Sequence, residues 1–137
     1  MNQPLFLLGD ADNVRKKMQG LLLSGNLDAL KALSSALSRH VAELSSLIEN
    51  SFAADIVFCG GDELLARVEY DKFNEGRLRE LTAGFKEKTG ITISFGVGRS
   101  VEEAFTNLSR AKSAEPGSIF SADRGASAAN PADQADS

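Results

Sequence analysis

Two adjacent glycines, Gly60 and Gly61, stand between two short apolar runs, residues 55–59 and 64–68. Glycine adopts the backbone angles that a tight turn between antiparallel strands requires. The sequence therefore predicts a β-hairpin here. A hairpin turn needs no acidic side chains, yet Asp62 and Glu63 directly follow the glycines. This pair of acids is the first indication of chemistry at the turn.

Helical and extended patterns surround the hairpin in a defined order. Residues 4–8 form an apolar run closed by Gly9 and Asp10, which is typical of a buried central strand. Further strands are predicted at residues 91–97 and 119–120, and helices at 14–23, 27–50, 71–90 and 100–113. Asn26, Asp71 and Ser100 are the expected N-caps of the last three helices.

The order of these elements contains a strand–helix–strand–strand–helix–strand core. This order predicts an α+β, ferredoxin-like fold with an antiparallel sheet and helices on one face. In that arrangement the first strand can lie beside the hairpin. We therefore expect Asp10 to come close to Asp62 and Glu63.

Length and composition limit the class of protein. The chain has 137 residues, and we expect one domain over residues 1–120 followed by a disordered Ala-, Ser- and Asp-rich tail over 121–137. A net charge of −4 argues against an extended nucleic-acid surface. One cysteine and no apolar run of ~20 residues predict a cytoplasmic protein with no membrane contact.

Converging carboxylates repel one another unless a cation neutralises them. A pair of Mg²⁺ or Mn²⁺ ions would do so, because hard cations take oxygen ligands and are often shared with substrate phosphates. The chain after Asp10 enters a helix, so we expect the backbone N–H groups of residues 12–15 to hold phosphate oxygens. Those residues are Asp12, Asn13, Val14 and Arg15.

Three further residues complete the predicted nucleotide site. Gly60 and Gly61 carry no side chain and would let a base or ribose approach the hairpin. Lys112 could bind a terminal phosphate as a point charge. The simpler interpretation stays open for each feature taken alone: Asp10 as a turn or capping residue, and Gly60 to Asp62 as turn chemistry.

Four segments together resemble a known family. LFLLGDADNVRK, VFCGGDELL, ITISFGVG and NLSRAKSAEPGSIF, spread over residues 5–120, are similar to the palm domain of GGDEF-type nucleotide cyclases. The small size is most similar to the minimal CRISPR polymerase family, whose members resemble the palm in the large subunit of type III CRISPR complexes. The resemblance implies a nucleotidyltransferase that condenses nucleoside triphosphates into cyclic di- or oligonucleotides and releases pyrophosphate, in antiviral defence signalling.

The resemblance also implies roles for individual residues. Asp10 and Asp62 match metal-binding aspartates, Glu63 completes the acidic pair, and these three are the implied catalytic residues. Ala11 matches the residue whose carbonyl binds metal. Gly60, Gly61 and Lys112 match the glycines of the signature and the phosphate-binding lysine.

Departures from the family pattern bear on the base. Leu64 stands where diguanylate cyclases carry Phe, and Met18 and Leu27 align with the Asn and Asp that read guanine. An apolar Met18 cannot make paired hydrogen bonds to guanine, which favours ATP over GTP. Open alternatives are a diguanylate cyclase-like enzyme using GTP, a palm that hydrolyses cyclic nucleotides, a non-catalytic nucleotide-binding module and a plain ferredoxin-like interaction domain.

Cyclisation joins two nucleotides, while one palm offers one acidic centre. The resemblance implies that two palms meet face to face, so we expect a homodimer or larger homo-oligomer across the faces that bear residues 60–63. A downstream receptor effector for the cyclic nucleotide is the other implied partner.

Overall fold

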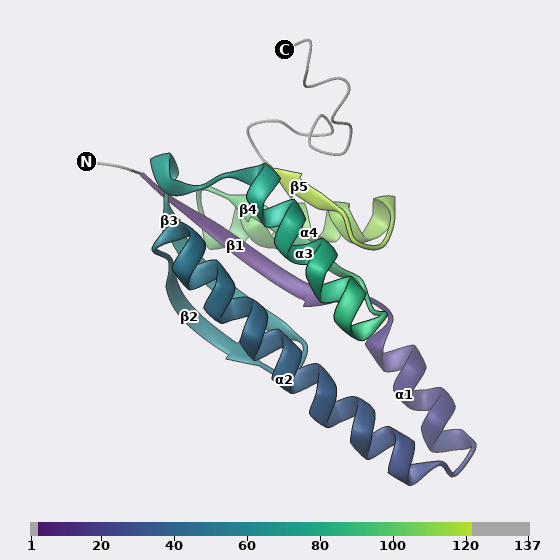
Figure 1. Ribbon diagram of the computed structural model, residues 1–137. Coiled ribbons are helices and arrows are strands. Elements are labelled where there is room, and N and C mark those ends of the chain that lie inside the picture. Colours follow the sequence, from purple (N-terminus) through teal and green to yellow (C-terminus); the bar gives the residue numbers. More distant parts are fainter. Residues whose placement is uncertain (1–2, 122–137) are drawn as a thin grey trace.

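The computed structural model describes residues 3–121 and folds as helices packed on one central sheet (Figure 1). The predicted tail lies outside the described residues except for Ser121. None of the described helices has the length and apolar character required to cross a membrane. The strands are β1 (Pro4–Ala11), β2 (Asp55–Gly60), β3 (Glu63–Glu69), β4 (Ile93–Gly98) and β5 (Ile119–Ser121). The helices are α1 (Val14–Leu23), α2 (Leu27–Phe52), α3 (Glu75–Thr89), α4 (Val101–Ala114) and the 3₁₀ helix η1 (Tyr70–Lys72).

The five strands form one sheet in the order β2-β3-β1-β4-β5. β1 is central and runs antiparallel to β3 and to β4, and β2 runs antiparallel to β3. This confirms the predicted α+β fold, its antiparallel core and the position of β1 beside the hairpin. β5 was expected only as a last edge strand. It pairs parallel with β4, so the complete sheet is mixed.

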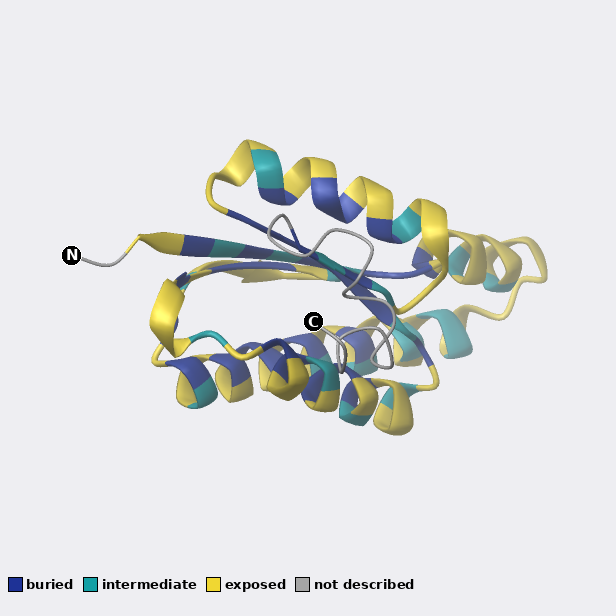
Figure 2. Ribbon diagram, turned by 90° about the horizontal axis from the view of Figure 1, so that it is seen from above, coloured by how far each residue is buried: buried dark blue, intermediate teal, exposed yellow. Residues whose placement is uncertain are grey.

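Helices cover both faces of the sheet (Figure 2). The predicted arrangement with helices on one face holds for α2 and α3, which belong to the core motif and pack against each other. It is wrong for α4, which packs on β4 and β1 from the opposite side. Gly96 makes this approach possible, because a Cβ there would lie 2.1 Å from the carbonyl oxygen of Ala104. Gly98 is similarly close, with a Cβ position 2.6 Å from the backbone nitrogen of Ala104.

The main apolar core lies between the sheet and the α2–α3 layer. Leu7 of β1, Ile48 of α2 and Phe95 of β4 are each fully buried in it. Burial of side chains of this size contributes about 1.5–3 kcal/mol each. The alternation of buried and half-buried residues along β1 directs Leu7 into this core and Leu8 and Asp10 to the α4 side.

Three helix N-termini are capped by side chains. Asn26 accepts a hydrogen bond from the N–H of Ala29 at 3.2 Å, as predicted for α2. Ser100 accepts one from the N–H of Glu103 at 3.1 Å, as predicted for α4. The expectation that Asp71 caps α3 is wrong, because Asp71 lies inside η1 and Asn74 caps α3 by accepting from Arg77 at 2.8 Å.

β2 is an edge strand of the sheet and forms the hairpin with β3. Its pairing with β3 shifts register between Ile56 and Phe58, which marks a β-bulge. Val57 and Phe58, at this shift, are both exposed. Gly61 at the hairpin turn has φ +58°, a conformation that glycine adopts without strain.

Candidate active site

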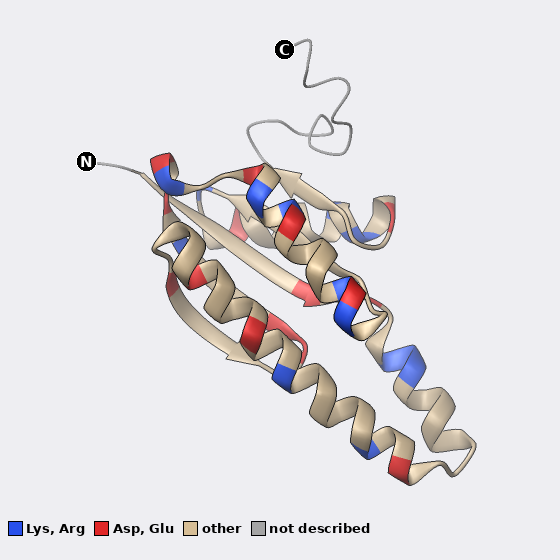
Figure 3. Ribbon diagram, in the orientation of Figure 1, with Lys and Arg blue, Asp and Glu red and all other residues tan. Residues whose placement is uncertain are grey.

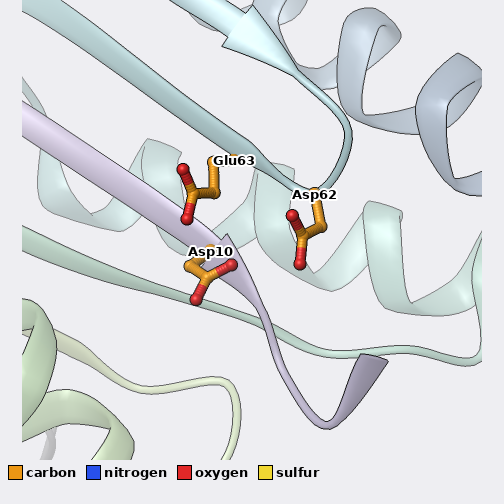
Figure 4. A group of neighbouring side chains, drawn as sticks. All are labelled: Asp10, Asp62 and Glu63. Carbon is orange, nitrogen blue, oxygen red and sulfur yellow. The ribbon is translucent and has the colours of Figure 1, made fainter. Parts of the chain in front are cut away.

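The end of β1 and the β2–β3 turn bring three acidic side chains together (Figure 4). Asp10 lies directly opposite Glu63 in the β1–β3 pairing. The N–H of Ala11 donates to the carbonyl oxygen of Asp62 at 2.9 Å, which fixes the turn against β1. One carboxylate oxygen from each of Asp10, Asp62 and Glu63 lies within 4.8 Å of the other two. The structure thus makes one cluster from the two acidic segments (Figure 3).

The cluster perturbs the protonation of Asp10. Burial raises the pKa of Asp10 from 3.8 to about 6, the nearby Lys112 opposes this change, and Asp62 and Glu63 add to it. A bound cation would stabilise the ionised form of such a carboxylate. Three carboxylates offer hard oxygen donors and little else, so this donor set fits a divalent ion such as Mg²⁺ or Mn²⁺.

Asp12 is two residues from Asp10 but has a different environment. It is buried, and its carboxylate accepts hydrogen bonds from Thr92 Oγ1 at 2.6 Å and from Ser94 Oγ at 2.9 Å. The N–H of Gly117 adds a further bond at 2.9 Å. The backbone N–H of Asp12, an expected phosphate donor, instead donates to the carbonyl of Thr92 at 2.9 Å.

The remaining expected phosphate donors lie at the start of α1. Asn13 precedes the helix with φ 60°, and Val14 is buried while Arg15 is exposed. The first helical hydrogen bond runs from the N–H of Lys17 to the carbonyl of Asn13 at 3.1 Å. The N–H groups of Val14 and Arg15 precede it in the first turn, where helix donors are available to an anion.

Lys112 of α4 reaches the acidic cluster from the side of the sheet that α4 covers. Its Nζ lies 3.4 Å from Oδ2 of Asp10 and 2.7 Å from Oδ1 of Asp12. It also donates to the carbonyl of Ala11 at 3.3 Å. The predicted phosphate-binding group is therefore adjacent to both predicted metal-binding groups of the β1 end, the Asp10 carboxylate and the Ala11 carbonyl.

A groove of about 420 Å³ opens beside the cluster, between α1, α2 and the hairpin turn. Asp62 and Gly61 form its hairpin end, and Arg15 lines it from α1. A Cβ at Gly60 or Gly61 would meet no atom within 4 Å, so the space over the turn is open. The size of the groove and its apolar lining, which includes Met18, Leu30 and Leu37, suit a flat, mostly apolar group such as a nucleobase.

The family model of the minimal CRISPR polymerase domain matches residues 6–122. The chain belongs to the minimal CRISPR polymerase family. This confirms the resemblance that the four sequence segments indicated. No curated protein matches this chain.

Solved structures share the fold of this minimal CRISPR polymerase domain at low identity. A crystal structure of a Csm1–Csm4 cassette in complex with one ATP has a TM-score of 0.66 and 18% identity, over 86% of this chain and 20% of that chain. The cassette in complex with cA4 gives a TM-score of 0.65 and 18% identity, over 85% and 20%. The chain thus spans only a fifth of the Csm1–Csm4 chains that it matches.

A palm of similar size also matches. The active GGEEF domain of a diguanylate cyclase from Vibrio cholerae has a TM-score of 0.52 and 14% identity, over 87% of this chain and 83% of that chain. These likenesses show that the domain has the fold of nucleotide cyclase and polymerase palms.

The two positions that align with guanine-reading residues differ in where they lie relative to the groove. Met18 lines the groove, so the predicted loss of a guanine contact falls on a groove residue. Leu27 is 61% exposed at the start of α2 and does not line the groove. Polar groups reach the groove from Gln19, Ser34 and Ser38, which the sequence did not single out.

Sequence reasoning also missed the residues that surround Asp12. Thr92, Ser94 and Gly117 were expected only as strand and loop residues. One signal was present in the sequence: Ser94 is a hydroxyl within a strand of apolar residues, and a fully buried hydroxyl requires a hydrogen-bond partner. The partner, Asp12, could not be identified because it lies 82 residues away along the chain.

Proposed function

We propose that the domain is a metal-dependent nucleotidyltransferase that condenses ATP into a cyclic di- or oligoadenylate and releases pyrophosphate. The observation that carries this proposal is the cluster of Asp10, Asp62 and Glu63 beside an open groove in a domain of the minimal CRISPR polymerase family. Asp10, Asp62 and the carbonyl of Ala11 would hold the cations. Bound Mg²⁺ or Mn²⁺ would neutralise the triphosphate and activate the attacking ribose hydroxyl.

The chain's own residues supply binding and orientation. The groove would take the base, with Gly60 and Gly61 leaving room for the ribose. The first-turn N–H groups of Val14 and Arg15 would hold phosphate oxygens, and the ammonium of Lys112 would attract the terminal phosphate as a point charge. In the reaction a ribose hydroxyl of one nucleotide gives up its proton to water and attacks the α-phosphorus of another. A P–O bond forms, and pyrophosphate leaves with the electrons of the broken P–O bond.

Adenine is the favoured base because Met18 lines the groove where a guanine-reading side chain would be needed. A methionine packs against the face of any base but cannot satisfy the donor edge of guanine. The hydroxyls of Ser34 and Ser38 and the amide of Gln19 remain as polar groups that can contact the base edge.

The test is an assay of purified protein with each ribonucleoside triphosphate and Mg²⁺ or Mn²⁺, read as pyrophosphate release and product mass. We expect cyclic adenylates from ATP and a loss of at least about a hundredfold in Asp62→Ala. Asp71→Ala also removes an aspartate carboxylate, but near the opposite end of β1, and is the matched control. No product from any triphosphate, with Asp62→Ala equal to the parent, would falsify the proposal.

Other outcomes of the same assay identify the alternatives. A cyclic guanylate would identify a diguanylate cyclase-like enzyme, and cleavage of an added cyclic dinucleotide would identify a hydrolase. Nucleotide binding by calorimetry without turnover would identify a binding module. A protein that binds no nucleotide even with metal present would be an interaction domain.

We propose a homodimer as the active form, because cyclisation requires two nucleotides and the described residues contain one acidic cluster. The hairpins of two copies would face each other, each with one nucleotide. Light scattering should show a dimer in the presence of nucleotide and metal. A monomer under all conditions, with cyclic product still formed, would contradict the dimer alone.

We propose that the cyclic product acts as a second messenger in anti-phage defence and is read by a separate receptor protein. The family to which the chain belongs supports this context. Phage challenge of cells that carry the wild-type protein and its neighbouring genes, or the same genes with Asp62→Ala, tests it. Equal plaque counts in both strains would count against a defence role.

A further inference from the structure

Lys112 makes three hydrogen bonds and one longer ion pair beside the acidic cluster. Its Nζ donates to Oδ1 of Asp12 at 2.7 Å and to the main-chain carbonyls of Asp10 at 3.2 Å and Ala11 at 3.3 Å. An ammonium carries three protons, so these three oxygens are sufficient acceptors. The Asp10 carboxylate, with Oδ2 at 3.4 Å, is the next oxygen outward.

Asp12 is the only charged acceptor among those three, and it is held in one place. Thr92 Oγ1, Ser94 Oγ and the N–H of Gly117 all donate to its carboxylate, whose side chain is only 6% exposed. These donors come from the segment before β4, from β4 itself and from the segment between α4 and β5. A buried carboxylate with this many donors keeps a fixed orientation, whereas the lysine stem is flexible.

We propose that Asp12 is a positioning residue: it accepts the shortest hydrogen bond of the Lys112 ammonium, at 2.7 Å, so that Asp10 keeps only a longer contact of 3.4 Å and its carboxylate stays available to a divalent cation. This inference rests on the proposed function for the metal at Asp10. Asp12 itself contacts neither metal nor nucleotide in this scheme, because its carboxylate is buried and its N–H is bonded to Thr92.

The geometry sets the consequence of losing the Asp12 charge. The Lys112 proton that now points to Asp12 would lose its strongest acceptor. The nearest carboxylate that remains is Asp10, already within 3.4 Å. Lys112 would then move closer to Asp10, strengthen that ion pair and compete with the cation for the same oxygen atoms.

This competition can be measured without nucleotide. We suggest titrating Mn²⁺ into the wild type, Asp12→Asn, Lys112→Met and the double variant, and measuring free Mn²⁺ by electron paramagnetic resonance. Asp12→Asn should bind Mn²⁺ about tenfold more weakly. This is the effect expected when one charge-assisted hydrogen bond from Lys112 to Asp10 competes with the ion. Lys112→Met should restore the affinity of Asp12→Asn to within about threefold of the wild type, because the competing ammonium is gone.

A merely structural role for Asp12 gives a different pattern. Local damage to the site would leave the double variant as weak as Asp12→Asn. That result, or unchanged Mn²⁺ affinity in a folded Asp12→Asn protein, would overturn the proposal. Melting temperatures from circular dichroism establish that each variant is folded.

A milder variant covers the case in which Asp12→Asn does not fold. Thr92→Val removes one hydrogen bond to Asp12 and keeps the charge, so Lys112 should be held less firmly. We expect about threefold weaker Mn²⁺ binding, again restored by Lys112→Met. Thr106→Val on the exposed side of α4 is the matched control and should bind Mn²⁺ as the wild type does. An unchanged affinity in Thr92→Val would then contradict the proposal.

The two proposals can fail separately. A protein that shows this Mn²⁺ pattern but forms no product from any triphosphate loses the proposed function and keeps the positioning role of Asp12. A protein that forms product while Lys112→Met fails to restore Mn²⁺ binding keeps the function and loses the positioning role. A wild type that binds no Mn²⁺ overturns the positioning role.

Discussion

The two faces of the central sheet are packed with different types of residue. On the α2–α3 face, large apolar residues such as Leu7, Ile48 and Phe95 form one continuous core. On the α4 face, glycines of β4 let the helix backbone approach closely, and the buried groups include Ser94 and Asp12. The first face supplies apolar burial, and the second holds polar groups in fixed positions.

The apolar core that stabilises the fold and the polar groups of the candidate site therefore lie on opposite faces of the same sheet. Close approach of α4 through Gly96 places Lys112 at the end of β1, where Asp10 and Asp12 lie. A thicker apolar layer on this face would hold α4, and with it Lys112, further from the strand. We therefore expect substitutions on the two faces to have different sizes and different readouts.

The largest effect on stability is expected on the α2–α3 face. Leu7→Ala should lower the free energy of unfolding by about 3 kcal/mol, because it leaves a cavity among fully buried neighbours. Urea denaturation measures this value. Leu8→Ala in the same strand is the matched control; its half-buried side chain points to the α4 side, and about 1 kcal/mol is expected. Equal costs for the two variants would remove the distinction between the faces.

The next effect concerns the close approach of α4. Gly96→Ala places a methyl group against the backbone of Ala104 and should destabilise by about 2 kcal/mol through overpacking. Gly20→Ala in α1 has open space around it and should instead stabilise by about 0.5–1 kcal/mol. Thermal unfolding of both variants measures these changes. A Gly96→Ala protein as stable as the wild type would show that α4 does not depend on this contact.

A gain in stability is expected from Asp10→Asn in the presence of a chelator. The pKa of Asp10 is raised by burial to about 6, so the stability that its protonated form contributes is complete below pH 3.8 and is lost as the pH rises through about 6. Near pH 7.5 the variant should therefore be more stable than the wild type by about 1 kcal/mol, allowing for partial exposure.

The advantage of Asp10→Asn should shrink as the pH is lowered towards 4, where the wild-type carboxyl is neutral as well. Melting temperatures measured across this range test the sign. Glu87→Gln, an exposed substitution in α3, should change stability by less than about 0.5 kcal/mol at any pH. An Asp10→Asn protein less stable than the wild type at pH 7.5 would contradict the stated cause.

The smallest effect on the free energy of unfolding is expected on the part of the sheet that α4 does not cover. Arg67 of β3 pairs with Asp55 of β2, and both side chains are more than half exposed. Arg67→Ala should change the free energy of unfolding by less than about 0.5 kcal/mol, and added salt should reduce the difference further. A cost above 1 kcal/mol in urea denaturation would show that this part of the face is also structurally important.

Local patterns were sufficient to predict the framework of the site. The hairpin followed from Gly60 and Gly61, and the neighbouring position of β1 followed from the order of the elements. Because antiparallel pairing then sets Asp10 opposite Glu63, the acidic cluster was predictable in outline. Asn26 and Ser100 were predictable caps because each acts on its own helix within one turn.

Features that depend on distant contacts were not predictable. The side of the sheet that α4 covers is decided by how closely its backbone can approach Gly96 and Gly98. The partners of Asp12 come from the segment before β4, from β4 and from the loop before β5, about 80 to 105 residues away. The cap of α3 was misplaced because Asp71 and Asn74 are both good capping residues, and only the extended backbone at Asn74 decides between them.

The bulge in β2 has a consequence for the behaviour of the protein at high concentration. An outer strand with exposed Val57 and Phe58 would ordinarily be a template on which another chain adds a strand and aggregates. The register shift between Ile56 and Phe58 interrupts the regular row of backbone N–H and carbonyl groups. An incoming strand therefore finds no continuous ladder to extend, so this edge keeps its apolar side chains exposed while discouraging fibrous self-association.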